Sequence, residues 1–267
     1  MPPRTEAELE MHGTTPDWVR LQCHDSGVII LTMLADANPE NRWIMPFQHA
    51  MHKAFDAIEG YLEANPAKAA ALLTVSESPK FFSNGIDPTG EYTKALNLPE
   101  FPKSDHLQNI VLGMPGFIRP LQLPIPTIAA INGHAFGAGL MYAAAHDYRF
   151  QRADRGYMCA IEVEIGVGIP PPEMELFKHI MPLPAYYETV MGAKRWGAKE
   201  ALQHGLIVAA CPKETLFEQA LAYAKSQVPL VAGTRKRWNY HAIKVKDISH
   251  LRLLWLKSLA PHRVSSC

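Results

Sequence analysis

The stretch PTIAAINGHAFGAGLMYAAAHDYRF, residues 126–150, changes its character twice along its length. Residues 126–131 form a short apolar run, which predicts a buried strand. Two glycines, Gly137 and Gly139, then precede an alanine-rich segment that predicts a helix ending at His146, and residues 148–151 predict another strand. The order of strand, glycine loop, helix and strand is typical of an α/β fold.

The segments that precede this stretch fit the same class. Residues 19–23 and 28–34 flank the turn residues HDSG and predict a hairpin. From Pro46 to about residue 65, apolar side chains recur every three or four positions, which predicts a helix with one buried face. Residues 71–75 predict a short buried strand, and a glycine-containing loop follows at residues 81–92.

Three regions follow from the order of these elements. Residues 1–17 are acidic, contain prolines and predict a flexible N-terminal arm. Residues 18–211 predict the α/β core, which closes with a helix at 198–204, the stop residue Gly205 and a strand at 206–211. Residues 212–267 predict a helical region with apolar positions that could pack on another subunit.

Composition limits the function classes. Lys and Arg number 26, as do Asp and Glu, so the net charge of zero gives no footprint for nucleic acid. The longest apolar run, residues 135–145, is shorter than the roughly 20 residues of a membrane span, and the N-terminus lacks the apolar core of a secretory signal. We therefore expect no membrane span and no secretion. The four cysteines show no metal-binding spacing, so we also expect no metal site.

Two glycine loops are candidates for binding an anion. Gly85 follows a buried strand in FFSNGID, where a sharp turn can leave an amide N–H facing a cavity. Gly137 and Gly139 begin a helix, whose first N–H groups have no partner within the helix. Two such amides could converge on one oxygen as an oxyanion hole. The alternative is that both loops are ordinary turns between strand and helix.

A candidate acid/base lies in IEVEIG, residues 161–166. The apolar neighbours of Glu162 and Glu164 predict that at least one carboxylate enters an apolar pocket, where its pKa would be raised. Such a carboxylate can take up a proton and return it, which is what moving a double bond requires. The alternative is an edge strand on which both glutamates face water.

These motifs together resemble the enoyl-CoA hydratase/isomerase (crotonase) family, and within it most closely the delta-3,delta-2-enoyl-CoA isomerases. The resemblance rests on residues 80–87, 126–150, 161–170 and 198–207. It implies an α/β fold built as a spiral of ββα repeats. It also implies that residues 212–267 are a helical trimerisation region, giving a homotrimer or a dimer of trimers.

The resemblance also assigns roles to individual residues. It places the oxyanion hole at the backbone N–H groups of Ile86 and Ala138, and the catalytic acid/base at Glu162. Hydratases of the family carry a second glutamate where this chain has Met141, and this difference favours isomerisation of 3-enoyl-CoA to 2-trans-enoyl-CoA. The residues expected to bind substrate are Ser83, Asn84, Gly85, Asp87, Gly137, Gly139 and Met141.

Further expectations concern ligands, location and alternatives. The resemblance implies an acyl-CoA substrate and no cofactor beyond the coenzyme A of that substrate. It implies a peroxisomal or mitochondrial location in a eukaryote and a cytoplasmic one in a bacterium. Candidates for an acyl tunnel, or equally for plain core, are Met141, Met114, Phe117 and Trp196. A hydratase that uses Glu164 as its second acid, and a non-catalytic subunit of the same fold, remain as alternatives.

Overall fold

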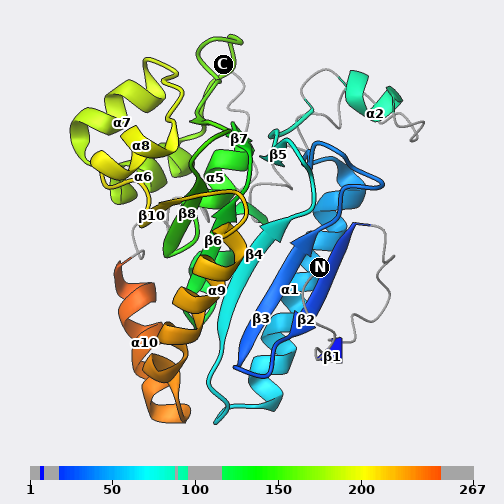
Figure 1. The fold of residues 1–267 in the computed structure, drawn as a ribbon, viewed down its shortest axis with the longest axis vertical. Helices are drawn as coiled ribbons and strands as arrows, with labels where there is room; N and C mark the ends of the chain where they lie inside the picture. The colour runs from blue at the N-terminus through cyan, green and yellow to red at the C-terminus, as the bar shows by residue number, and fades with distance from the viewer. Residues whose placement is uncertain (1–6, 9–17, 88–89, 96–115, 248–267) are drawn as a thin grey trace, which may run out of the picture.

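A computed structural model describes residues 7–8, 18–87, 90–95 and 116–247, which form two β-sheets surrounded by helices (Figure 1). Across the larger sheet the strands are β1 (Ala7–Glu8), β2 (Val19–Cys23), β3 (Val28–Met33), β4 (Ala71–Ser76), β6 (Thr127–Ile131), β8 (Tyr148–Arg152) and β10 (Ala209–Cys211). Across the smaller sheet they are β5 (Phe81–Ser83), β7 (His134–Phe136) and β9 (Met158–Cys159).

The helices follow the strands along the chain. They are α1 (Met45–Ala64), α2 (Glu91–Ala95), α4 (Arg119–Gln122), α5 (Ala138–Ala144), α6 (Pro171–Ile180), α7 (Leu183–Val190), α8 (Ala198–Gln203), α9 (Leu216–Gln227) and α10 (Thr234–Asp247), with a 3-10 helix at Val228–Val231. Within the described ranges, no helix is long and apolar enough to cross a membrane.

The predicted hairpin is confirmed as the antiparallel pair β2 and β3, in which Val19 lies opposite Met33. Its turn requires Gly27, because the φ angle there is +82° and a Cβ atom would lie 2.8 Å from the carbonyl oxygen of Ala69. From β3 to β10 the neighbouring strands of the larger sheet are parallel. Each crossover must therefore return the chain to the same end of the sheet.

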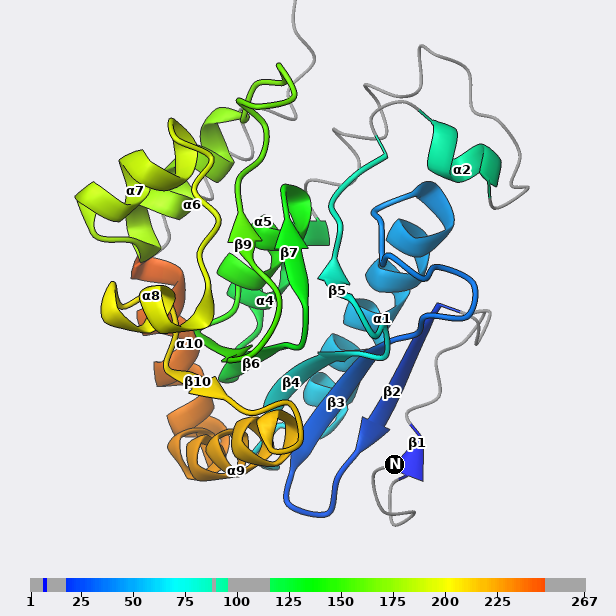
Figure 2. The same ribbon diagram turned by 45° about the horizontal axis from the view of Figure 1, so that its top comes forward.

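The two sheets are connected by a repeated unit. Strands β4, β6 and β8 of the larger sheet are each followed by one strand of the smaller sheet, namely β5, β7 and β9. These three short strands are parallel and lie side by side (Figure 2). Helix α5 follows β7 and α6 follows β9, so the predicted spiral of ββα repeats is confirmed.

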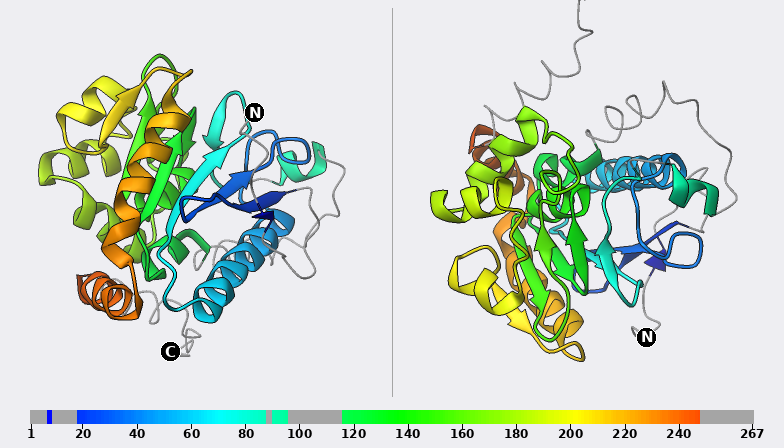
Figure 3. Two further views of the ribbon diagram at one scale, coloured as in Figure 1. Left: turned by 60° about the horizontal axis from the view of Figure 1, so that its bottom comes forward. Right: turned by 90° about the horizontal axis from the view of Figure 1, so that it is seen from above.

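Both faces of the larger sheet are buried, and β3 shows why. Its six residues are all buried. Ile29 and Leu31 belong to the apolar cluster that contains α1, whereas Val28 and Ile30 belong to a second cluster that contains α9. Figure 3 shows α9 lying across the sheet on the side opposite α1. The region after residue 211 therefore begins with a helix that closes the core of its own chain.

Several sequence predictions can be compared directly with these elements. The helix from Pro46 is confirmed as α1, and the helix before Gly205 as α8, with a φ angle of +70° at that glycine. Most of the predicted N-terminal arm lies outside the described residues, but Ala7–Glu8 pairs with β2 and forms one edge of the larger sheet. The prediction of a loop over residues 81–92 is wrong at its two ends, where β5 and the start of α2 lie. Strands β5, β7 and β9 are not predicted, because each is short and lies within a loop-like sequence.

Candidate active site

A cavity of about 360 Å³ lies where the three strands of the smaller sheet end. The segment after β5 contributes residues 84–87, the segment after β7 contributes Gly137 and Ala138, and the segment after β9 contributes Ile161 and Glu162. Parallel strands end at the same edge of a sheet, which brings these three distant segments together. Both glycine loops and one of the candidate acids therefore border a single cavity.

The amide of Ile86 is held by the backbone around it. Gly85 has a φ angle of +75°, and a Cβ atom there would lie 2.7 Å from the carbonyl oxygen of Phe136. The N–H of Trp43 donates to the carbonyl oxygen of Gly85 at 2.8 Å. Because a trans peptide unit is planar, this bond fixes the N–H of Ile86 in the opposite direction. That N–H donates to no residue among those the structure describes.

The amide of Ala138 is held by the first turn of α5. The carbonyl oxygen of Gly137 accepts hydrogen bonds from the N–H groups of Leu140 and Met141, at 2.9 and 3.1 Å. The N–H of Ala138 belongs to the same peptide unit, points the opposite way and has no partner within the helix. A Cβ atom on Gly85 would lie 3.3 Å from the nitrogen of Ala138, so the two loops are in direct contact.

The carboxyl group of Glu162 lies beside this second loop. Its side chain is buried, and a Cβ atom placed on Gly137 would lie 3.0 Å from its Oε1 atom. Its Oε2 atom is buried without a hydrogen-bond partner among the described residues. Burial raises the pKa of Glu162. The prediction of a carboxylate in an apolar pocket is therefore confirmed.

The alternative of an edge strand at residues 161–166 is wrong, because this segment is a turn. The carbonyl oxygen of Ile161 accepts the N–H groups of Glu164 and Ile165, at 3.0 and 3.3 Å, which wraps the chain tightly. Only Glu162 enters the cavity, whereas Glu164 is exposed.

Glu164 is engaged with a different partner. Both of its carboxylate oxygens accept from the guanidinium of Arg195, at 2.7 and 2.6 Å, and this pairing lowers the pKa of Glu164. The two glutamates do not share a strand face, so the suggestion that Glu164 pairs with Glu162 as a second acid is contradicted by the structure.

Four of the seven residues expected to bind substrate line the cavity: Asn84, Gly85, Asp87 and Gly137. The other three support the site from behind, and for them the expectation of a substrate contact needs correction. Ser83 is fully buried, and its hydroxyl donates to the carbonyl oxygen of Asn41 at 2.7 Å. A Cβ atom on Gly139 would lie only 2.2 Å from the carbonyl oxygen of Ser83, so Gly139 allows the two loops to pack.

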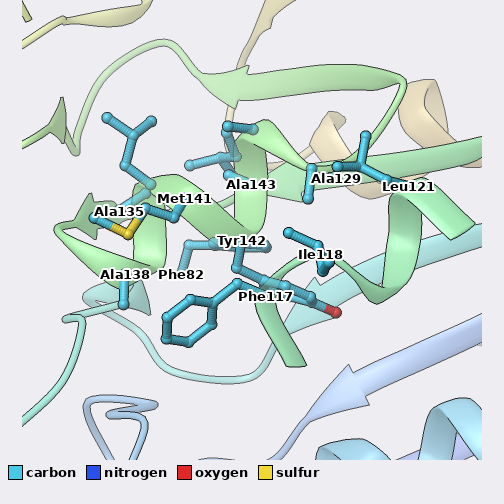
Figure 4. Packing of buried hydrophobic residues seen from close by; sticks show 14 of the residues in the cluster. Phe82, Phe117, Ile118, Leu121, Ala129, Ala135, Ala138, Met141, Tyr142 and Ala143 are labelled. Carbon is cyan, nitrogen blue, oxygen red and sulfur yellow. The ribbon is translucent and has the colours of Figure 1, made fainter. Parts of the chain in front are cut away.

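Met141 is the third of these supporting residues. It is buried in the apolar cluster with Phe82, Phe117 and Tyr142, as Figure 4 shows, and it does not line the cavity. Phe117 and Trp196 are also core residues, and the indole N–H of Trp196 donates to Thr189. Met114 lies outside the described residues. The three described candidates for an acyl tunnel, Met141, Phe117 and Trp196, are therefore residues of the hydrophobic core.

Some residues that line the cavity carried no signal in the sequence. Arg42 comes from the loop before α1 and Tyr92 from α2, and the guanidinium of Arg42 lies 5.1 Å from the centre of the Tyr92 ring. Arg42 also donates to Glu40 and to the carbonyl oxygen of Ile86, at 2.7 and 2.9 Å. It thereby fixes the chain beside the first amide. A buried acid in the first turn of α6, Glu173, is likewise not predicted, because an acid at that place in a helix is ordinarily exposed.

Comparisons with known proteins agree with this architecture. A chain from Pseudomonas syringae described as an enoyl-CoA hydratase/isomerase family protein superposes with a TM-score of 0.74 at 21% identity, covering 91% of this chain and 95% of that one. An enoyl-CoA isomerase of Mycobacterium tuberculosis gives a TM-score of 0.72 at 22% identity, covering 92% and 97%. At these identities the likeness concerns the fold.

Sequence comparison identifies nearer relatives. "Enoyl-CoA delta isomerase 2, peroxisomal" of Arabidopsis thaliana is 36% identical over 144 residues, 51% of this chain and 57% of the relative. "Enoyl-CoA delta isomerase 3" of the same plant is 32% identical over 184 residues, 66% of this chain and 71% of the relative. Carnitinyl-CoA dehydratase of Escherichia coli K12 is 30% identical over 164 residues, 61% of this chain and 59% of the relative.

These matches span little more than half the length of the first and third of these relatives. The family model described as enoyl-CoA hydratase/isomerase, however, matches residues 25–233, well over half of the chain. This range includes both glycine loops and Glu162. The chain belongs to the enoyl-CoA hydratase/isomerase family.

Proposed function

We propose that this protein isomerises 3-enoyl-CoA to 2-trans-enoyl-CoA, with Glu162 as the single acid/base and the amides of Ile86 and Ala138 as the oxyanion hole. The observation that carries the proposal is that the buried carboxyl of Glu162 and the amides of Ile86 and Ala138 border one cavity. Among the described residues, neither amide nor the Oε2 atom of Glu162 has a hydrogen-bond partner. The names of the Arabidopsis relatives support the same reaction class.

In the proposed mechanism the thioester carbonyl oxygen accepts hydrogen bonds from the N–H groups of Ile86 and Ala138. Glu162 removes a proton from the α-carbon, and the C–H electron pair moves into a dienolate whose negative charge is largely on that oxygen. The protonated Glu162 then delivers its proton to the γ-carbon. The double bond moves into conjugation, the carboxylate is regenerated, and no electrons are gained or lost.

The environment of Glu162 suits both halves of this reaction. A general acid/base works best when its pKa is close to the working pH, and burial moves the pKa of Glu162 upward in that direction. Ile161, Ile165 and Val167 line the cavity beside it, and the Glu162 side chain is itself buried, which limits the access of water to the carboxylate. The thioester itself acidifies the α-proton, so we propose that the reaction needs no cofactor beyond the coenzyme A of the substrate.

Hydration is the second candidate function, because the relatives include a dehydratase. Adding water to 2-enoyl-CoA in the manner of the family's hydratases requires a second carboxylate to orient and split the water. The position expected to provide it holds Met141, which is buried in the core, and Glu164 is bound to Arg195. A non-catalytic role is disfavoured because the Oε2 atom of Glu162 and both amides have no hydrogen-bond partner within the part of the chain that the structure describes.

The proposal extends to assembly and location. We propose a homotrimer or a dimer of trimers. Apolar side chains that are exposed in the single chain support this proposal: Trp238 and Ile243 on α10, and Met191 directly after α7. Trp238 and Ile243 are 67% and 70% exposed in the single chain. Light scattering after size-exclusion chromatography tests this assembly. If the protein is eukaryotic, we propose a peroxisomal or mitochondrial location, in line with the peroxisomal names of two plant relatives, and otherwise a cytoplasmic one.

The function itself is tested by incubating the purified protein separately with 3-enoyl-CoA and with 2-enoyl-CoA. Conjugation of the first substrate is followed by the absorbance of the conjugated thioester, and hydration of the second by its loss. Isomerisation as the dominant activity supports the proposal. Dominant hydration overturns it.

A further inference from the structure

Glu173 is a second buried carboxyl group, which the proposed mechanism does not use. It lies in the first turn of α6, and its side chain is only 1% exposed. Neither of its carboxylate oxygens has a hydrogen-bond partner among the described residues. An ionised carboxylate in such a place carries a large desolvation cost, which a proton on the group removes.

The neighbourhood of Glu173 connects it with Glu162. Helix α6 packs against α5, the helix that begins with the Ala138 amide. Burial raises the pKa of Glu173 to about 8, and the negative charge of Glu162 contributes to the rise. A proton on Glu173 therefore leaves Glu162 as the group of this pair that can carry the negative charge near neutral pH.

Arg42, Asp87 and Glu91 line the same cavity as Glu162, and Arg42 is bound to Glu40. Tyr142 on α5 is fully buried, which raises its pKa and keeps it neutral. Burial raises the pKa of the Cys159 thiol on β9 to about 11, so it stays neutral. The exposed pair of Glu164 and Arg195 cancels its own charge. The other titratable side chains of α6 and of α7, which packs on α6, are Glu175 with its partner Lys178, His179 with its partner Asp247, Tyr186, Tyr187, and Glu188 with its partner Lys194.

We propose that Glu173 is a positioning residue for Glu162: a neutral, proton-bearing carboxyl that leaves Glu162 as the only buried anion of the site. The inference rests on the proposed function and adds a residue to it. Glu173 keeps its proton throughout the reaction. When Glu162 takes up the α-proton, the negative charge moves to the thioester oxygen, and no second anion opposes it.

Ionisation of Glu173 then switches the site off. A second buried anion would oppose the formation of the dienolate and make Glu162 slower to give up its proton to the γ-carbon. The kcat of the wild-type protein should therefore fall on the alkaline side. With a midpoint near pH 8, about tenfold of the activity is lost by pH 9. In Glu173→Gln, which keeps the shape and removes the titration, the same rise in pH should change kcat less than twofold.

A titration that does not depend on turnover tests the charge state directly. Infrared spectroscopy of the whole protein follows the carbonyl stretch of protonated carboxyl groups between pH 6 and pH 10. We expect a band that disappears with a midpoint near pH 8 in the wild type and is absent in Glu173→Gln. In Glu162→Gln, which leaves Glu173 in place, the midpoint should move to lower pH. Glu175→Gln, two residues along the same helix and with a side chain that is 31% exposed, should leave the titration unchanged.

The possible outcomes separate this inference from the proposed function. If the titrating band survives in Glu173→Gln, or its midpoint does not move in Glu162→Gln, the inference is wrong whatever the enzyme does. The second variant decides the matter even if Glu173→Gln does not fold. If the wild type fails to isomerise 3-enoyl-CoA at any pH, the proposed function is wrong, while the titration still reports whether the two carboxyl groups are coupled.

Discussion

A Cβ atom placed on Gly137 would lie 3.0 Å from Oε1 of Glu162, so the acid approaches the backbone directly beside the Ala138 amide. The candidate base Glu162 and the candidate oxyanion donor at Ala138 can lie close together because Gly137, which lies between them, has no side chain. Gly137 also has φ and ψ angles of 53° and −121°, which residues other than glycine rarely adopt.

Gly137→Ala should therefore reduce activity more than it reduces stability. The added methyl group displaces the carboxylate and strains the peptide that presents the Ala138 N–H, and misplacement by about 1 Å can cost on the order of 100-fold in rate. The measurement is kcat on 3-enoyl-CoA together with the thermal midpoint. Gly60→Ala is the matched control, because nothing lies within 4 Å of a Cβ there. Equal kcat values for the two variants would contradict this account of Gly137.

Stability should depend on pH through the buried glutamates. Burial raises the folded-state pKa of Glu173 to about 8 from an ordinary value of 4.5, so the folded protein binds the proton more tightly than the unfolded chain. This contribution to stability is fully present below about pH 4.5 and is lost as the pH rises towards 8. Glu162 acts in the same direction.

The corresponding measurement is urea denaturation of the wild type and Glu173→Gln at pH 5 and pH 8. The difference between the two proteins isolates Glu173 from other titrating groups. From pH 5 to pH 8, the free energy of unfolding of the wild type should fall by up to a few kcal/mol relative to that of Glu173→Gln. A difference that is independent of pH would show that Glu173 is charged in the folded protein at pH 5 already.

The last described helix, α10, should depend on one buried lysine. The ammonium group of Lys244 donates to the carbonyl oxygen of Pro120 at 2.9 Å and to Asp147 at 2.8 Å, and its side chain is 8% exposed. Removing one member of a buried ion pair leaves the other charge unpaired and costs about 3–5 kcal/mol.

Lys244→Met should therefore lower the free energy of unfolding by about 3 kcal/mol in urea denaturation. Lys246→Met, an exposed position on the same helix, should change it by less than about 0.5 kcal/mol. If the two variants are equally stable, the buried pair does not anchor α10.

Long periodic elements of the fold could be predicted from the sequence, and short ones could not. The 20 residues of α1 repeat their apolar positions over several turns, and the hairpin of β2 and β3 has a turn signal between two runs. Strands β7 and β9 have three and two residues, too few for any periodicity. They are extended because they pair with each other, and this is decided by the packing of distant segments.

The site divides in the same way. The amides of Ile86 and Ala138 and the carboxyl of Glu162 lie within sequence motifs. Arg42 reaches the cavity from a loop and Tyr92 from the five-residue helix α2, and neither segment has a recognisable pattern. Glu173 was missed because an acid in the first turn of a helix ordinarily lies in solvent, where the helix dipole favours it. Its burial depends on how α6 packs against α5, and nothing in the local sequence carries that information.

The most direct test of the central claim compares Glu162→Gln with Glu164→Gln on 3-enoyl-CoA. The two residues are two positions apart, one buried in the cavity and the other bound to Arg195 at the surface. Loss of the acid/base should lower kcat by about 10²–10⁴-fold in Glu162→Gln, while Glu164→Gln stays within about twofold of the wild type, as expected of an exposed ion pair. Retention of isomerase activity in Glu162→Gln would contradict the account.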